Sequence, residues 1–235
     1  MSLFLSRLSL NPRSQQAISE IGHPYELHRT LSKAFPPDTF HKERQDDDAA
    51  GLLFRVDGQT CADSVVVLIQ SRIAPDWAYL NDVKDTWGHA YLLRAPESRP
   101  FILKLAAGQD LAFHLRANPT KRLGKSAGDN KGKRVGIYKE DEQLKWLEEK
   151  LQGNQGKGRA PSGFRLVRVQ VSRDEKIEDK PAFNSARPAL ELLSVQFDGI
   201  LKVENVALAC QTIQRGIGSA KGFGFGLLSL ARIKE

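Results

Sequence analysis

A segment near the amino terminus carries side chains suited to acid–base chemistry. Residues 24–35 are expected to form a helix, because Pro24 fits the first helical position and Pro36-Pro37 would stop the helix. At about 100° per residue, Leu27, Leu31 and Ala34 share an apolar stripe that would pack on a sheet. The opposite stripe is polar and holds Tyr25, His28, Arg29, Ser32 and Lys33.

An imidazole, a phenol and two cations within about two helical turns are the groups needed to cleave RNA without a metal. In that reaction a 2′-hydroxyl loses a proton, a 5′-oxygen gains one, and the charge of the phosphorane must be stabilised. Histidine exchanges protons near neutral pH, and arginine and lysine bind phosphate oxygens. The same stripe also fits an ordinary solvated helix face. His23 is expected to begin the helix, and His41 and His89 have no such neighbours in the sequence.

A second stretch with possible function is glycine-rich and lies near the carboxyl terminus. Residues 216–226 contain five glycines and Lys221, between a helical pattern at 206–215 and an apolar strand-like run. Exposed backbone N–H groups beside a cation would suit a phosphate. The spacing does not fit a dinucleotide fingerprint or a P-loop, and it fits an RNP1 strand only in part. A flexible turn packed against a strand remains the alternative.

Charge is distributed unevenly along the chain. The 235 residues have a formal net charge of +7, and residues 116–134 carry seven basic side chains against one acid, Asp129. Residues 157–173 add five basic side chains and no acid. Clusters of this kind are typical of proteins that bind a polyanion, and together with the glycine-rich turn they favour nucleic acid over a solvated surface.

Composition predicts an ordinary soluble protein, and we expect it in the cytoplasm. The sequence has no apolar run near 18 residues and no signal-peptide pattern. Cys61 and Cys210 are isolated, which argues against a disulfide framework and against a zinc site, so each is expected to be a lone buried thiol. No metal and no cofactor are expected. Trp77, Tyr79 and Trp87 are expected to be core or packing aromatics rather than ligand-binding ones.

The pattern of strands and helices predicts two similar α+β halves. Strands are expected at 3–10, 52–57, 65–70, 110–117 and 164–172, and helices at 24–35, 140–151 and 206–215. Asp198-Gly199 predicts a hairpin turn between strands at 190–197 and 200–204. The second helix of the first half is weakly indicated, at 75–83. Each half would then be an antiparallel sheet with helices on one face. The expected division is a first domain at 1–120, a basic linker or loop at 121–134, and a second domain at 135–235.

Several motifs, in order along the chain, resemble the CasE family of CRISPR precursor-RNA endoribonucleases from the type I-E Cascade system. They are PYELHRTLSKA at 24–34, Gln70-Ser71, Pro75-Asp76-Trp77, LRANPTKR at 115–122, Lys145-Trp146-Leu147, GIGSAK at 216–221 and GLLSL at 226–230. No confident match is found between residues 173 and 188. The resemblance implies tandem ferredoxin-like (RRM-like) domains with antiparallel sheets.

By this resemblance the substrate is the hairpin repeat of a CRISPR transcript. It would be cut once at the base of the stem without metal, leaving a 2′,3′-cyclic phosphate and a 5′-hydroxyl. The product would stay bound, and the protein would join other Cascade subunits. No membrane partner is implied.

The resemblance assigns the catalytic roles to the 24–35 helix. His28 would transfer the proton, as base or acid, Tyr25 would orient or assist, and Lys33 would act with Arg29 on the phosphate. The residues expected to bind RNA are Arg29, Arg116, Lys121, Arg122, Arg134, Arg165, Arg168, Ser219 and Lys221. Two alternatives stay open: a non-cleaving RNA-binding protein of the same fold, and a small-molecule or nucleotide enzyme that uses the glycine-rich turn.

Overall fold

A computed structural model describes residues 2–39, 50–61, 64–124, 129, 131–153, 160–179 and 190–233. It divides into two compact units. Of the described residues, unit 1 takes those in Met1–Lys104 and Lys221–Leu227, with Asp179, and unit 2 takes those in Leu105–Glu178, Ala189–Ala220 and Leu228–Glu235. The sequence placed residues 105–120 in the first domain, whereas here they are grouped with the second unit.

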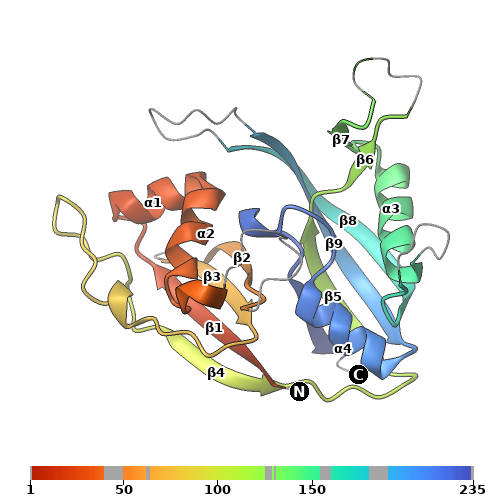
Figure 1. Cartoon of the computed structure of the whole chain (residues 1–235), viewed down its shortest axis with the longest axis horizontal. Coiled ribbons are helices and arrows are strands. Elements are labelled where there is room, and N and C mark those ends of the chain that lie inside the picture. Colours follow the sequence, from red (N-terminus) through yellow and green to blue (C-terminus); the bar gives the residue numbers. More distant parts are fainter. Residues whose placement is uncertain are drawn as a thin grey trace. The chain divides into compact units, whose positions relative to one another are not determined.

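Unit 1 is a four-stranded antiparallel sheet with helices on one face (Figure 1). The strand order is β2-β3-β1-β4. Its elements are β1 (Ser2–Leu10), α1 (Gln15–Gly22), α2 (Pro24–Ser32), a 3₁₀ turn η1 (Pro37–Thr39), β2 (Leu53–Cys61), β3 (Ser64–Ser71), a 3₁₀ turn η2 (Ala78–Leu80) and β4 (Glu97–Ile102).

The core of unit 1 lies between the sheet and the two helices. Leu27 and Leu31 of α2 are completely buried against residues of β1 and β3 such as Leu8 and Val67. Burial of a leucine side chain contributes about 1.5–3 kcal/mol. The apolar stripe predicted for the 24–35 helix is therefore the face that attaches α2 to the sheet.

A buried carboxylate joins α1 to α2 and to the loop before β4. Glu20 of α1 accepts hydrogen bonds from the Thr30 hydroxyl at 3.0 Å and from the Tyr91 hydroxyl at 2.6 Å. The Tyr79 hydroxyl donates to the Thr30 carbonyl. Burial, followed by the charge of Glu20, raises the pKa values of both phenols. The phenols therefore stay protonated and act as donors, and the network limits movement of α2.

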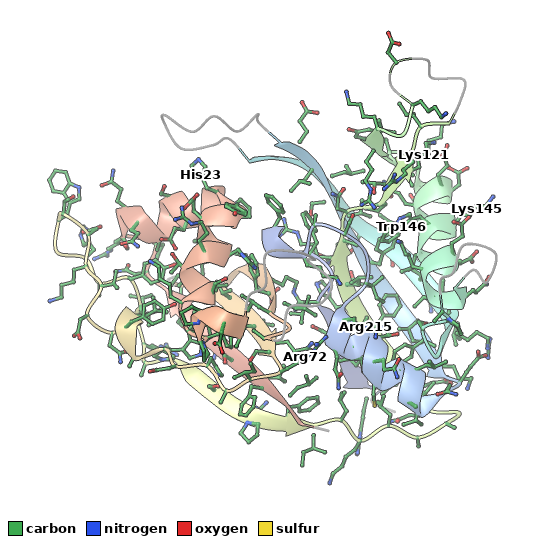
Figure 2. The ribbon with its side chains drawn as sticks, viewed as in Figure 1. His23, Arg72, Lys121, Lys145, Trp146 and Arg215 are labelled. Atoms are coloured by element: carbon green, nitrogen blue, oxygen red, sulfur yellow. The ribbon has the colours of Figure 1, made fainter. Side chains whose placement is uncertain are left out.

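Unit 2 repeats the arrangement with a hairpin inserted after its first strand. Its elements are β5 (Asp110–Ala117), β6 (Thr120–Arg122), β7 (Arg134–Gly136), α3 (Glu140–Gln152), β8 (Phe164–Asp179), β9 (Leu190–Val203), α4 (Val206–Arg215) and β10 (Leu228–Arg232). The main sheet has the order β10-β5-β9-β8, and β6 pairs with β7. Trp146 of α3 (Figure 2) stacks on Phe197 of β9 with ring centroids 6.2 Å apart, which packs the helix on the sheet.

Both sheet orders are those of the ferredoxin-like fold, so the predicted α+β class with tandem ferredoxin-like domains is confirmed. The prediction missed α1, and the weak second helix of the first half is only the short turn η2. The basic segment predicted as a linker or loop contains the paired strands β6 and β7 at its ends.

The hairpin predicted at Asp198-Gly199 is wrong, because β9 runs without interruption through both residues. The lack of a side chain at Gly199 matters for a different reason, its closeness to the neighbouring strand. A Cβ atom built on Gly199 would lie 2.0 Å from the Arg168 carbonyl oxygen of β8. The glycine therefore allows a close approach of two backbones rather than a turn.

Four other expectations concern single side chains. Trp77 is only 5% exposed, as expected, but Trp87 is 76% exposed, and the prediction that it packs in the core is wrong. Cys210 is a free thiol and is half-buried rather than buried. The side chain of Cys61 lies outside the described residues.

Among the helices that the structure describes, none is long and apolar enough to cross a membrane.

Replacing Glu20 by alanine is expected to lower the free energy of unfolding by about 1–3 kcal/mol, because the buried donors on Thr30 and Tyr91 lose their acceptor. Urea unfolding followed by circular dichroism measures this loss. Glu97→Ala is the control: its pair with Arg7 is at the surface, 3.5 Å long, and worth about 0–1 kcal/mol. Equal losses for the two variants would contradict the structural role of Glu20.

Candidate active site

The position of α2 determines which of its polar side chains face inward. Pro24 occupies the first turn, and Lys33, Ala34 and Phe35 follow in a tighter turn in which each N–H donates to the carbonyl three residues earlier, at 3.2 Å. The helix therefore ends at Ser32, earlier than predicted. Tyr25, His28 and Ser32 are half-buried, whereas Arg29 and Lys33 are exposed. The predicted polar stripe thus has an inner edge carrying the imidazole and an outer edge carrying the cations.

The second half of the glycine-rich stretch packs against this inner edge within unit 1. Lys221–Phe223 forms a 3₁₀ turn, η5, which contacts both α2 and β2. The Phe223 ring lies 5.8 Å from the Tyr25 ring, and the Tyr25 ring lies 6.4 Å from the His28 ring, centroid to centroid. Phe54 of β2 lies 6.1 Å from His28. We call Tyr25, His28, Phe54 and Phe223 the aromatic cluster.

Glycine backbones allow the turn to come this close. Gly224 has φ +82°, and a Cβ atom built on it would lie 3.2 Å from the Phe54 ring. Gly222 faces the imidazole, and a Cβ atom there would be 3.7 Å from His28 Cδ2. Just before η5, Ala220 has φ +63°, a left-handed conformation that is uncommon for a residue other than glycine. The backbone on both sides of Lys221–Phe223 is therefore shaped to present this turn.

Burial within the aromatic cluster lowers the pKa of His28 below its ordinary value of 6.5. The cause is desolvation, which penalises the charged imidazolium. The imidazole is then neutral at pH 7 and has a nitrogen that can accept a proton. The Ser32 hydroxyl donates to the His28 carbonyl at 2.7 Å, so Ser32 supports the helix backbone and not the ring.

The cations of α2 lie beside the imidazole but remain in solvent. Arg29 pairs with Glu26 at 2.9 Å across the helix surface. An exposed pair of this type is worth about 0–1 kcal/mol, so a phosphate could replace the carboxylate at small cost. Lys221 of η5 is half-buried. Among the described residues, no group of His, Cys, Asp or Glu side chains is arranged to hold a metal ion.

The other predicted RNA contacts lie in unit 2. Arg122 and Arg134 are exposed and directly opposite each other in the β6–β7 hairpin. Lys121, on the same hairpin (Figure 2), pairs with Glu142 of α3. Two like charges directly opposite each other repel, so Arg122 and Arg134 favour a bound anion.

Arg116 and Arg165 already have partners within unit 2. Arg116 Nε donates to the Ser194 hydroxyl at 2.7 Å, and Arg165 pairs with Glu204 at 3.1 Å. Arg168 is exposed on β8, and Ser219 is half-buried. Near Ser219, Gly218 has φ +94° and packs against Trp146. The RNA-binding roles of all these residues remain predictions.

Sequence reasoning missed one member of the aromatic cluster. Phe54 reads as an ordinary core residue of β2, and nothing in its local sequence connects it with His28. Phe223 was noted only as part of a partial RNP1 match. The stacked Tyr25 and His28 rings, by contrast, follow directly from helical spacing.

The two sheets place this chain in the class of tandem ferredoxin-like proteins. One unit holds the shielded imidazole and the other holds the basic hairpin. The chain matches the family model described as CRISPR associated protein over residues 3–232. It belongs to the Cse3/CasE family of CRISPR-associated endoribonucleases, which confirms the resemblance seen in the sequence.

Two similar proteins and one solved structure support this membership. The CRISPR-associated endoribonuclease Cse3 of Thermus thermophilus is 36% identical over 231 residues, covering 97% of this chain and 100% of that protein. The CRISPR system Cascade subunit CasE of Escherichia coli is 30% identical over 214 residues, covering 88% and 91%. A solved structure of CRISPR endoribonuclease Cse3 bound to 19 nt RNA has a TM-score of 0.78 at 34% identity, covering 98% and 100%.

Replacing Gly224 by alanine is expected to lower the free energy of unfolding by about 1–2 kcal/mol, the cost of a left-handed backbone for a residue with a Cβ atom. The close approach to Phe54 adds to this loss. Gly222→Ala is the matched control: Gly222 does not have a positive φ, and its added methyl would make an ordinary contact. Chemical denaturation measures both. If Gly222→Ala lowers the free energy of unfolding as much as Gly224→Ala or more, the result would contradict this packing of η5 on β2.

Proposed function

We propose that this chain cuts the repeat hairpin of a CRISPR transcript at the base of its stem, without a metal, and keeps the product for a Cascade-type complex. The observation that carries the proposal is the shielded His28 imidazole between Tyr25, Phe54 and the η5 turn. Two similar proteins support the substrate and the assembly: one is named a CRISPR-associated endoribonuclease and the other a Cascade subunit.

His28 would act as the general base in this reaction. The neutral imidazole takes the proton of the 2′-hydroxyl, the 2′-oxygen attacks the adjacent phosphorus, and the bond to the 5′-oxygen breaks. The products are a 2′,3′-cyclic phosphate and a 5′-hydroxyl. The lowered pKa of His28 supports the base role, because the form that accepts a proton predominates at pH 7.

The remaining groups of α2 would assist the reaction. The Tyr25 ring stacks on His28 and would orient it. The Tyr25 phenol or the Lys33 ammonium, just beyond the end of α2, would give a proton to the leaving 5′-oxygen. Arg29 would exchange Glu26 for a phosphate oxygen, and Lys221 would hold the phosphate from the side of the η5 turn. Charge on the phosphorane is then stabilised by cations that are already in place before the reaction.

The stem of the hairpin would be bound mainly by unit 2. The deep, narrow major groove of A-form RNA prevents base readout, so a stem is recognised through its backbone and shape. Exposed cations such as Arg122, Arg134 and Arg168 suit this task. Binding and cleavage would then depend on different residues, with affinity arising from many phosphate contacts and the rate depending on one imidazole.

His28→Ala is expected to slow cleavage of a synthetic repeat hairpin by about 10²–10⁴-fold, the usual contribution of a positioned proton-transfer group. Affinity for the RNA should not change, because the variant removes no positive charge. Single-turnover cleavage in EDTA and filter binding measure the two effects on the same preparation.

His23→Ala is the matched control for this experiment. His23 precedes the same helix, its side chain does not cap α2, and its Nδ1 atom lies 2.7 Å from the Ser19 carbonyl oxygen. The control should cut at the wild-type rate. If the wild-type protein binds the hairpin tightly but does not cut it, the chain is an RNA-binding protein without nuclease activity.

A further inference from the structure

Trp87 differs from the other two tryptophans of the chain in its exposure. Trp77 and Trp146 are 5% and 7% exposed, as is usual for this residue, whereas Trp87 is 76% exposed. It lies near the tip of a turn in unit 1, residues 83–91, which we call the Trp87 turn. An indole in water lacks the hydrophobic stabilisation that burial would give. Single exposed apolar side chains are common, so what distinguishes Trp87 is how its turn is held.

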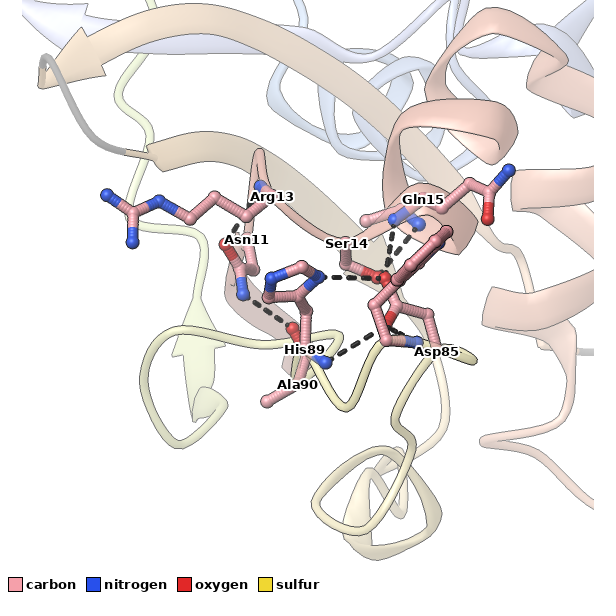
Figure 3. Close-up of polar contacts among 9 residues, drawn as sticks. Asn11, Arg13, Ser14, Gln15, Asp85, His89 and Ala90 are labelled. Atoms are coloured by element: carbon pink, nitrogen blue, oxygen red, sulfur yellow. Dashed lines mark hydrogen bonds and ion pairs between the residues drawn. The ribbon is translucent and has the colours of Figure 1, made fainter.

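The Trp87 turn is held by a nearly buried carboxylate. The Asp85 side chain is only 4% exposed. It accepts hydrogen bonds of 2.9 Å from the backbone N–H groups of Trp87, His89 and Gln15, and it lies 3.3 Å from His89 Nδ1 (Figure 3). Because Gln15 is the first residue of α1, this carboxylate fastens the turn to that helix.

The base of the turn is fixed to the sheet and the core. The Asn11 side-chain amide donates to the Ala90 carbonyl at 2.8 Å (Figure 3). The Asn11 backbone N–H donates to the Tyr91 carbonyl at 2.9 Å. Tyr91 is completely buried, and its hydroxyl reaches Glu20. Lys84 and Ala90 form a β-bridge across the turn. The exposed indole is therefore attached to a rigid support and not to a loose loop.

Rigid display of an exposed tryptophan is characteristic of an interface anchor. Tryptophan is enriched among the few residues that dominate binding energy, where it fills a pocket of the partner. A turn already held in one conformation loses little entropy when it binds. The indole N–H also needs an acceptor once it is buried. The geometry of the Trp87 turn suits a pocket with apolar walls and an acceptor, such as a carbonyl, at its end.

The charge around the turn argues for a protein partner and against RNA. Residues 82–94 contain two acidic and two basic side chains, so their formal charge cancels. Sites that stack single-stranded nucleic acid combine aromatic rings with a positively charged groove. The basic side chains of this chain are concentrated elsewhere, above all at 116–134.

We propose that Trp87 is the anchor by which this chain docks into an apolar pocket of another protein subunit in its Cascade-type complex. This proposal rests on the proposed function, which supplies the complex. Asp85 is the positioning residue of the anchor, since it touches the turn and not the partner. RNA cleavage does not require this surface.

Trp87→Ala is expected to weaken docking about 30-fold or more, the effect of losing an interface hot spot. The full-length chain would be titrated onto a Cascade complex from the same source assembled without it, loaded with repeat-derived RNA, and binding measured by interferometry. The isolated variant should still cut the repeat hairpin at the wild-type rate. Ile233→Ala, which shortens another exposed apolar side chain, is the matched control and should dock normally. Asp85→Ala should weaken docking with the indole still present.

Each other outcome identifies a different error. Normal docking of Trp87→Ala, with a wild-type chain that docks and cuts, overturns the anchor and leaves the proposed function intact. Weaker hairpin binding by the isolated variant would mean that Trp87 stacks on RNA, which overturns a protein partner. A wild-type dimer that Trp87→Ala dissociates would place the pocket on a second copy of the chain and also overturn the proposal. A wild-type chain that neither cuts nor docks would overturn the proposed function itself.

Discussion

The packing of the η5 turn on α2 is the contact on which the site depends. It joins two segments almost 200 residues apart in the sequence, and it buries an imidazole that helical periodicity alone would leave on a polar surface. Glycine is required where the turn meets Phe54, because a side chain at Gly224 would need a left-handed conformation and would push the ring away. The rest of unit 1 supports this contact: the buried Glu20 network and the leucine stripe hold α2 in place on the sheet.

The proposed reaction needs a neutral proton acceptor and charged phosphate-binding groups, and the structure buries the first and exposes the second. The imidazole is shielded, which lowers its pKa and keeps it ready to accept a proton. The cations that would bind phosphate stay at the surface, where desolvation costs little and the existing ion pairs are weak enough to exchange. A buried arginine such as Arg55, paired with Asp57 in β2, is by contrast a structural ion pair and a poor candidate for RNA binding.

Much of the fold could be predicted from the sequence because the signals are local. Alternation identified β1 and β5, and Pro24 with Pro36-Pro37 located α2 to within a few residues. The errors arise where a non-local contact decides the outcome. Asp198-Gly199 reads as a turn, but Gly199 is required by the close approach of β8.

The same distinction holds for the site. Spacing on α2 predicted that Tyr25 and His28 would lie together, and the structure places their rings in a stack. Spacing could not predict Phe54 or the contact with η5, because both come from distant segments. Trp87 was assigned to the core because the sequence shows an aromatic residue but not its exposure. Asp85 fixes the Trp87 turn by accepting hydrogen bonds from backbone N–H groups. Such bonds have no signature in the sequence.

The most direct measurement of the central claim is the pKa of His28 in the folded protein. Its ring resonances can be assigned by comparison with His28→Ala and followed by NMR as the pH is changed, with the urea-unfolded chain as the internal reference. The packing of η5 on α2 predicts a midpoint below the ordinary value of 6.5 in the folded protein and a return to that value on unfolding. A folded-state midpoint at or above 6.5 would mean that burial does not govern the titration of this imidazole, and it would contradict the account.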